Sequence, residues 1–230
     1  MSGSTRGVDV SSWQHPYGEQ VDWEEVAKEG FTFALVKATQ GTHWVNSWLD
    51  RDLDDARAAG LLVGAYHYFE LGPAPKDQAE HFVGSLLGQW LDLGVWLDWE
   101  PPAMANFTAT GYIDEFVNST NDGRPNCGLY VDLAWLEVLK STNRTFGRLW
   151  LADWTPAAPH EGQLIWQEKI GTVKGIPAPV DIDVLTTTRA ANLPTAPAPK
   201  PTAATVHSMV PKDEPEEEKT VSDDKENVGE

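Results

Sequence analysis

The sequence contains a single cysteine, Cys127, so no disulfide bond can form within the chain. It has no run of about 18 apolar residues, the length that a membrane-spanning helix requires. Its first residues, MSGSTRGVDV, lack the apolar stretch of a secretory signal peptide. These absences predict a protein that is made in the cytoplasm without a signal peptide and has no part embedded in a membrane.

Basic residues are scarce as well. Lys and Arg number 17 against 35 Asp and Glu, which gives a formal net charge of −18. Nucleic acids and anionic membranes attract proteins largely through Lys and Arg, so we expect neither as a partner. The six histidines show no zinc-binding spacing such as H-E-x-x-H, and neither a G-x-S-x-G motif nor a P-loop is present. Zinc, serine-hydrolase and nucleotide chemistry therefore have no support.

Tryptophan, in contrast, is abundant, with 11 residues. Tryptophan and tyrosine are favoured where a surface stacks on a partner and also forms hydrogen bonds with it. Sugars are one such partner. The alternative is a thick core, since 41% of the residues are hydrophobic. The number of tryptophans leaves both interpretations open.

The composition changes near Ala190. Residues 191–230 are rich in Pro and Ala and then in Asp and Glu, and they include no aromatic residue. Such a segment cannot bury enough apolar surface to offset the entropy lost on ordering. We predict one folded domain over residues 1–190 and a disordered acidic tail over residues 191–230.

Strand-like and helix-like segments alternate through the predicted domain. The expected strands begin at Arg6, Phe31, Leu61, Gly94, Cys127, Arg148, Gln163 and Ala178. Helix-like segments separate the first six strands, and strands separated by helices indicate parallel crossovers. Eight strands are the right number to close a barrel. The predicted fold class is α/β, a distorted TIM-like barrel of five β/α units plus three further strands.

Acidic residues stand in the first, fourth and last of these strands. In GVWLDWEPP (94–102), Asp98 and Glu100 share one face because side chains alternate along a strand. Asp9 lies in the first strand and Asp181 in the last, and these two strands are neighbours in a closed barrel. We predict that the four acids converge at the carboxyl ends of the strands, where such barrels carry their chemistry.

A cluster of acids has several uses. In glycoside hydrolysis one carboxylic acid protonates the leaving oxygen while a second carboxylate assists at the sugar. Neighbouring negative charges raise the pKa of one member and keep its proton available. The alternatives are binding of Ca²⁺ or Mg²⁺ and purely structural capping or pairing. Four acids at matching strand positions, with Trp96 and Trp99 around two of them, favour the glycosidase.

The residues also resemble a known family, the glycoside hydrolase family 25 muramidases or Chalaropsis-type lysozymes, which include many phage endolysins. The resemblance covers almost all of residues 6–186, in the family's order. The matching stretches are GVDVSSWQ (7–14), FALVKATQGT (33–42), AAGLLVGAYHYF (58–69), QAEHF (78–82), WLDWE (96–100), LWLADW (149–154), IWQ (165–167) and VDIDVL (180–185). The D-x-E of the fourth strand together with the opening G-V-D-x-S is the specific part.

The resemblance implies a flattened barrel of five β/α units and three more strands. It implies cleavage of the β-1,4 bond between N-acetylmuramic acid and N-acetylglucosamine in peptidoglycan, with no cofactor and no metal. Glu100 matches the proton donor, Asp98 its partner acid, and Asp9 and Asp181 the remaining two acids. The family picture has retained anomeric configuration, with the 2-acetamido group of the substrate as nucleophile.

Three positions depart from the family pattern. Members usually have Glu where this chain has Gln40, Tyr where it has Glu168, and Asn where it has Asp183. None of these is one of the four matched acids. We therefore expect activity to be retained, with an altered pH optimum and specificity.

Other residues near the strand ends are candidates for substrate binding. Tyr66, Tyr130, Trp154 and Trp166 form either a stacking groove for the glycan or part of the core. Lys37, inside an apolar strand, is expected to pair with an acid of the cluster, and direct contact with substrate is the alternative. His67 is expected to be a hydrogen-bonded core histidine.

These features predict a monomeric muramidase that acts on bacterial peptidoglycan. The absent signal peptide favours a phage endolysin, which would accumulate in the host cytoplasm and reach the cell wall on lysis. Two rivals remain: a catalytically inactive glycan-binding protein on the same barrel, and a structural protein that binds metal through the four acids.

Overall fold

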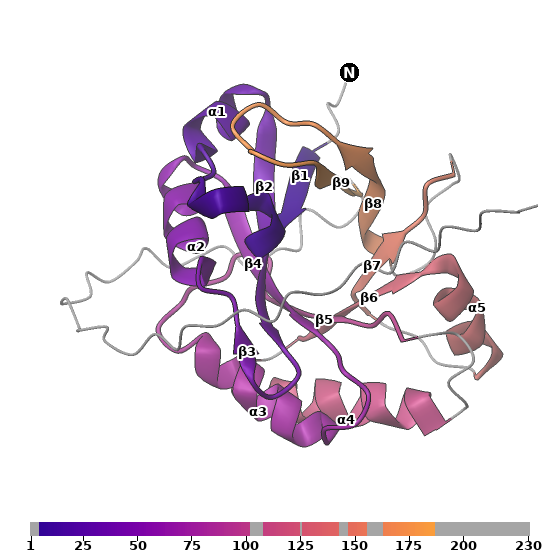
Figure 1. Cartoon of the computed structure of the whole chain (residues 1–230). Helices are drawn as coiled ribbons and strands as arrows, with labels where there is room; N and C mark the ends of the chain where they lie inside the picture. The colour runs from indigo at the N-terminus through magenta and orange to yellow at the C-terminus, as the bar shows by residue number, and fades with distance from the viewer. Residues whose placement is uncertain (1–4, 102–107, 125, 143–146, 156–162, 187–230) are drawn as a thin grey trace, which may run out of the picture. The chain divides into compact units, whose positions relative to one another are not determined.

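Eight of the nine described strands form one closed barrel (Figure 1). The computed structural model describes residues 5–101, 108–124, 126–142, 147–155 and 163–186. All of these described residues belong to one compact unit. The expected tail, residues 191–230, lies outside the described residues, so the predicted domain boundary stays a prediction.

The described part contains nine strands. They are β1 (Thr5–Val10), β2 (Phe31–Gln40), β3 (Trp44–Val45), β4 (Leu62–Tyr68), β5 (Val95–Asp98), β6 (Gly128–Asp132), β7 (Leu149–Ala152), β8 (Gln163–Gly171) and β9 (Val180–Leu185). Their order in the sheet is β1-β9-β8-β7-β6-β5-β4-β2-β3, and β1 also pairs with β2. That pairing closes a barrel of eight strands and leaves β3 outside it.

Most neighbours in the barrel are parallel, as crossover helices require. The helices are α1 (Trp23–Lys28), α2 (Leu49–Ala58), α3 (Pro75–Ser85), α4 (Thr108–Gly123) and α5 (Leu133–Ser141). Each follows one of the strands β1, β2, β4, β5 and β6 in the chain, and α3 and α4 lie side by side (Figure 1). The last strand, β9, is antiparallel to both β8 and β1. The predicted α/β barrel of five β/α units plus three strands is confirmed.

Alternation along each strand divides the core into two layers. In β2, Phe33 and Leu35 belong to the cluster that fills the barrel, whereas Ala34 and Val36 belong to the cluster between the sheet and the helices. The barrel is filled largely by aromatic rings, and Trp150 makes edge contacts with both Trp96 and Tyr130. Several of the tryptophans are therefore core residues, as one of the two sequence interpretations expected.

Two details differ from the sequence-based expectation. The two-residue strand β3, antiparallel to the end of β2, is too short to give a periodic pattern. The segment KDQAEHFVGSLLGQW (76–90) predicts one helix up to Trp90, whereas α3 ends at Ser85. Gly88 beyond it has a φ of 85°, which no residue of a right-handed helix adopts.

Candidate active site

Strand β5 positions the first two acids. Asp98 is its last residue and lies on the same face as Trp96, which points into the barrel. We expected the strand to continue through Glu100, but it ends at Asp98. Backbone hydrogen bonds to both neighbouring strands still hold the chain at this point. The backbone oxygen of Asp98 accepts from the Phe69 N–H at 3.0 Å, and the Trp99 N–H donates to the backbone oxygen of Tyr130 at 3.1 Å.

Strands β1 and β9 position the other two acids. Asp9 and Asp181 are directly opposite each other in the antiparallel pair of these strands. Asp9 is buried and Asp181 is half-buried. The two residues are 172 positions apart in the chain, and only closure of the barrel brings them together.

The four acids lie close enough to influence one another. Burial is the largest cause that raises the pKa of Asp98, followed by the negative charge of Glu100. Burial also raises the pKa of Asp181, to about 6, and Glu100 adds to it. For Asp9, burial raises the pKa well above its usual range, and the charges of Asp181 and Asp98 contribute. The structure thus brings the four predicted acids into one cluster.

Glu100 differs from the other three because its side chain is exposed, at the wall of a pocket. Its pKa is nevertheless raised, chiefly because the protein around the pocket displaces water from the carboxyl group. The nearby Tyr130 hydroxyl and the charge of Lys37 lower this pKa, and the charge of Asp132 raises it. The balance keeps a proton on Glu100 to higher pH than in an ordinary glutamate.

Lys37 supplies positive charge beside the cluster. It lies on the inner face of β2, two residues after Leu35. Its charge lowers the pKa of both Asp98 and Glu100, and its pairing with one of these acids stays a prediction. Its Nζ also donates to Gln40 at 2.7 Å and lies 4.5 Å from the centre of the Tyr68 ring.

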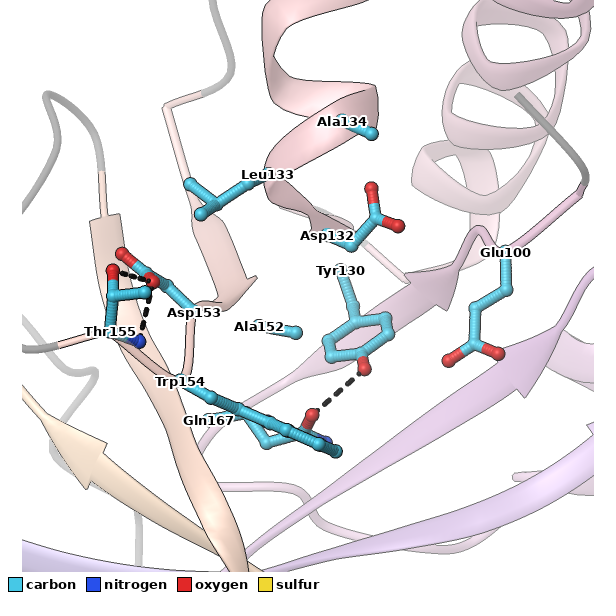
Figure 2. Close-up of a pocket in the computed structure, with 10 residues that line it drawn as sticks. All are labelled: Glu100, Tyr130, Asp132, Leu133, Ala134, Ala152, Asp153, Trp154, Thr155 and Gln167. Carbon is cyan, nitrogen blue, oxygen red and sulfur yellow. Dashed lines mark hydrogen bonds between the residues drawn. The ribbon is translucent and has the colours of Figure 1, made fainter. Parts of the chain in front are cut away.

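The pocket beside Glu100 has a volume of about 470 Å³ (Figure 2). Its lining residues are Glu100, Tyr130, Asp132, Leu133, Ala134, Ala152, Asp153, Trp154, Thr155 and Gln167. Figure 2 shows Glu100 on one side of Tyr130 and the Trp154 indole on the other. Glu100 is one of the lining residues, whereas Asp9, Asp98 and Asp181 are not. Asp9 and Asp98 are buried, with exposed fractions of 8% and 7%.

A chain of hydrogen bonds joins the pocket to the buried acids. The Tyr130 hydroxyl donates to Gln167 Oε1 at 3.0 Å, and Gln167 Nε2 donates to Asp9 Oδ2 at 3.1 Å. Gln167 was absent from the residues predicted for the site, although it is the last residue of the IWQ stretch. The signal that could have found it is an amide on the inner face of an apolar strand, where it needs partners.

The four aromatic candidates have different positions. Tyr130 and Trp154 line the pocket, and Trp154 is 63% exposed. Tyr66 is buried beside the acids. Burial is the main cause that raises its pKa, and the negative charges of the acids raise it further. Trp166 is not among the residues that line the pocket, and its indole donates to the backbone oxygen of Asp153.

His67 is a core histidine, as predicted. It is fully buried, and its two ring nitrogens bond to Thr39 at 2.7 Å and Gln78 at 3.1 Å. Burial lowers its pKa to about 3. Within the described ranges, no group of three or more His, Cys, Asp or Glu side chains is arranged to hold a metal ion. In the same ranges, no helix is both long and apolar enough to cross a membrane.

Comparison with known proteins places this barrel in a family. Residues 8–172 match the model of the glycosyl hydrolases family 25. The chain belongs to this family. The match includes Asp9, Asp98 and Glu100 and ends before Asp181.

The curated relatives by sequence include a lysozyme. The autolytic lysozyme of Clostridium acetobutylicum is 27% identical over 189 residues, which are 77% of this chain and 55% of that protein. The chain spans about half or less of the length of the curated relatives that it matches.

Solved structures share the fold. The bacterial lysozyme of Streptomyces coelicolor superposes with a TM-score of 0.70 at 24% identity, covering 84% of this chain and 96% of that one. The catalytic domain of endolysin ply40, from bacteriophage P40 of Listeria monocytogenes, gives a TM-score of 0.67 at 21% identity and covers 82% and 96%.

Proposed function

We propose that this chain is an N-acetylmuramidase that hydrolyses the β-1,4 bond between N-acetylmuramic acid and N-acetylglucosamine in bacterial peptidoglycan. The observation that carries the proposal is the cluster of Asp9, Asp98, Glu100 and Asp181 beside a pocket whose wall holds Glu100. A structural role for acids would not require four of them to share one barrel end at the cost of raised pKa values. Membership of a glycosyl hydrolase family agrees with this activity.

Glu100 has the properties of the general acid. Its raised pKa keeps the proton available, and its position on the pocket wall gives the proton access to a bound glycosidic oxygen. In the proposed first step, the Glu100 proton moves to that oxygen as the bond to the anomeric carbon breaks. In the second step the Glu100 carboxylate accepts a proton from the attacking water.

Asp98 is suited to hold the 2-acetamido group of the substrate. Its Oδ1 is buried and has no hydrogen-bond partner among the described residues. In the proposed mechanism this oxygen accepts a bond from the acetamido N–H, and the acetamido oxygen then attacks the anomeric carbon from the face opposite the leaving group. This substrate-assisted route retains the anomeric configuration. An initially inverted product anomer, detected by NMR, would exclude it.

The pocket supplies candidate sugar contacts. The exposed Trp154 ring offers a stacking surface, and Tyr130 and Asp132 offer hydrogen-bonding groups on the same wall. Lys37, whose charge acts on Asp98 and Glu100, is proposed as a further substrate contact.

The decisive experiment compares wild type with Glu100→Gln on purified peptidoglycan and identifies the released fragments by mass spectrometry. We expect wild type to release fragments with N-acetylmuramic acid at the reducing end. The variant should be slower by about 10²–10⁴-fold, the usual contribution of a general acid. Glu115→Gln, an exposed glutamate on α4, is the matched control. Wall binding without cleavage by wild type would favour the glycan-binding alternative.

For the biological role we propose lysis of a bacterial host, as by a phage endolysin. The fold shared with the endolysin ply40 supports this role, and an autolytic lysozyme among the relatives defines the competing one. Expression in bacteria without a membrane-permeabilising partner separates them. An endolysin should stay inside the intact cells, and spontaneous appearance in the medium would argue for the autolysin role.

A further inference from the structure

An irregularity near the end of β2 brings two polar side chains onto the same face of the strand. The register of β2 against β4 shifts between Lys37 and Thr39. In a regular strand, residues three apart point to opposite faces, and the extra residue of a bulge returns them to one face. Lys37 Nζ can therefore donate to Gln40 Oε1, at 2.7 Å.

On its other side Gln40 bonds to Glu70, two residues after the end of β4. Gln40 Nε2 donates to Glu70 Oε1 at 2.9 Å. The fully buried Gln78 fixes the Glu70 backbone, because it accepts from the N–H at 3.0 Å and donates to the backbone oxygen at 2.9 Å. Gly41 leaves room for the carboxylate, since a Cβ there would collide with Glu70 Oε2. Glu70 is therefore a fixed anchor for Gln40.

The amide of Gln40 suits both of its partners. An ammonium group only donates hydrogen bonds, and an ionised carboxylate only accepts them. The amide offers its oxygen to Lys37 and an N–H to Glu70. An ionised carboxylate at position 40 could not donate to Glu70, and an apolar side chain would bond to neither partner. Gln40 therefore links Lys37 to the anchor without adding a negative charge beside it.

The ammonium group of Lys37 lies against two aromatic rings and within electrostatic reach of the acid cluster. Its Nζ is 4.5 Å from the centre of the Tyr68 ring and 5.2 Å from that of the Trp44 ring. Its positive charge lowers the pKa of Asp98 and of Glu100. An ionised Asp98 is the stronger acceptor for the acetamido N–H of the substrate, so the position of this charge matters for the proposed reaction.

We propose that Gln40 is a positioning residue, which bridges Lys37 to Glu70 and thereby holds the Lys37 ammonium group at the acid cluster. The inference rests on the proposed function, because the acids that this charge acts on are assigned to the reaction there. Gln40 does not line the pocket beside Glu100, and its effect passes through Lys37. Loss of Gln40 should therefore matter only while Lys37 is present.

A double-mutant cycle tests this dependence. Gln40→Met has a similar length and forms neither hydrogen bond. We expect it to lower kcat/KM on soluble peptidoglycan fragments by about tenfold, as for the loss of one hydrogen bond to a charged group. In a Lys37→Met background the same change should lower kcat/KM by less than about twofold, because the group that Gln40 positions is already gone.

The anchor and a second glutamine provide the comparisons. Glu70→Leu should reproduce the loss seen in Gln40→Met, whereas Glu70→Gln keeps an acceptor for the Gln40 amide and should recover most of the activity. Gln89→Met is the matched control. Gln89 is also half-buried and donates to a carboxylate, that of Asp50 at 2.8 Å, but it does not line the pocket. It should behave as wild type.

Nuclear magnetic relaxation of the lysine side chains tests the positioning without any activity. In protein labelled with 15N-lysine, the Lys37 ammonium group should be more rigid than that of Lys76, whose side chain is 64% exposed. The Lys37 signal is assigned by its absence in Lys37→Met. Gln40→Met should raise the mobility of Lys37 toward that of Lys76 and leave Lys76 unchanged.

The outcomes are distinguishable. The proposal is overturned if Lys37 is as rigid in Gln40→Met as in wild type, or if Gln40→Met lowers kcat/KM equally in both backgrounds. If Gln40→Met does not fold, the relaxation of Lys37 in Glu70→Leu and its recovery in Glu70→Gln decide the question. Absence of peptidoglycan cleavage by wild type would reject the proposed function, whereas the relaxation measurements would still test whether Gln40 holds Lys37.

Discussion

At the scale of single residues, Asp98 and Glu100 are only two positions apart but have different environments. Asp98 is 7% exposed and has an unpartnered oxygen, whereas Glu100 is exposed at the pocket. Burial and neighbouring charge raise the pKa of both. This difference in exposure agrees with the proposed roles, proton donation by Glu100 and orientation of the acetamido group by Asp98.

Asp132 provides a test of the charge around Glu100. It caps α5 by accepting from the Trp135 N–H at 2.8 Å, and its negative charge raises the pKa of Glu100. Asp132→Asn keeps the cap but removes the charge, so the pKa of Glu100 should fall. The acid then loses its proton at lower pH, and the alkaline limb of the activity profile should move to lower pH by less than about one unit.

The matched control for this variant is Asp22→Asn. Asp22 caps α1 by accepting from the Glu25 N–H at 3.0 Å and does not line the pocket. Its pH profile should coincide with that of wild type. An unchanged alkaline limb in Asp132→Asn would show that Glu100 does not set that limb.

At the scale of elements, the sequence predicted what depends on local periodicity. The period-two pattern of strands such as WLDWE and VDIDVL predicted which acids face the barrel. It could not predict contacts between distant segments. Gln167, which joins Tyr130 to Asp9, is one example. The pairing of His15 with Asp52 is another, because 37 positions separate them.

The His15–Asp52 pair ties the segment after β1 to helix α2. Asp52 is 1% exposed, bonds to His15 Nε2 at 2.9 Å and accepts from the Trp23 indole at 3.2 Å. Asp52→Ala should lower the free energy of unfolding by about 3–5 kcal/mol, because it leaves buried polar groups without a partner. Denaturant unfolding measures this loss.

Asp54 on the same helix serves as the control. Its side chain is exposed and pairs with Arg57 at 2.9 Å. Asp54→Ala should cost no more than about 1 kcal/mol, as is usual for a surface pair. Equal losses in the two variants would mean that the buried pair does not anchor the segment.

At the scale of the whole molecule, the folded barrel concentrates acids whose pKa values are raised, to about 6 for Asp181 and about 8 for Asp183. Raised values mean that stability increases as the pH falls through them. His67 acts in the opposite direction, because its pKa in the folded protein is lowered to about 3. Its contribution to stability is lost as the pH falls below the pKa of histidine in the unfolded chain. That unfolded value is about 6.5, so the opposing effect is confined to lower pH.

We therefore expect the melting temperature to rise as the pH falls from about 8.5 to about 6.5. The formal net charge of −18 acts in the same direction, since protonation relieves repulsion. Differential scanning calorimetry at constant ionic strength measures the trend. A flat or falling melting temperature over this range would contradict the raised pKa values of the buried acids.

The position of β9 has a consequence for synthesis on the ribosome. The strand that carries Asp181 and Asp183 is the last of the barrel to be translated, and its partner β1, with Asp9, is the first. Pairing over such a separation closes a long loop and is slow. The acid cluster therefore assembles only after nearly the whole barrel has left the ribosome. A nascent chain truncated before Val180 would lack hydrolytic activity even where its earlier strands had formed.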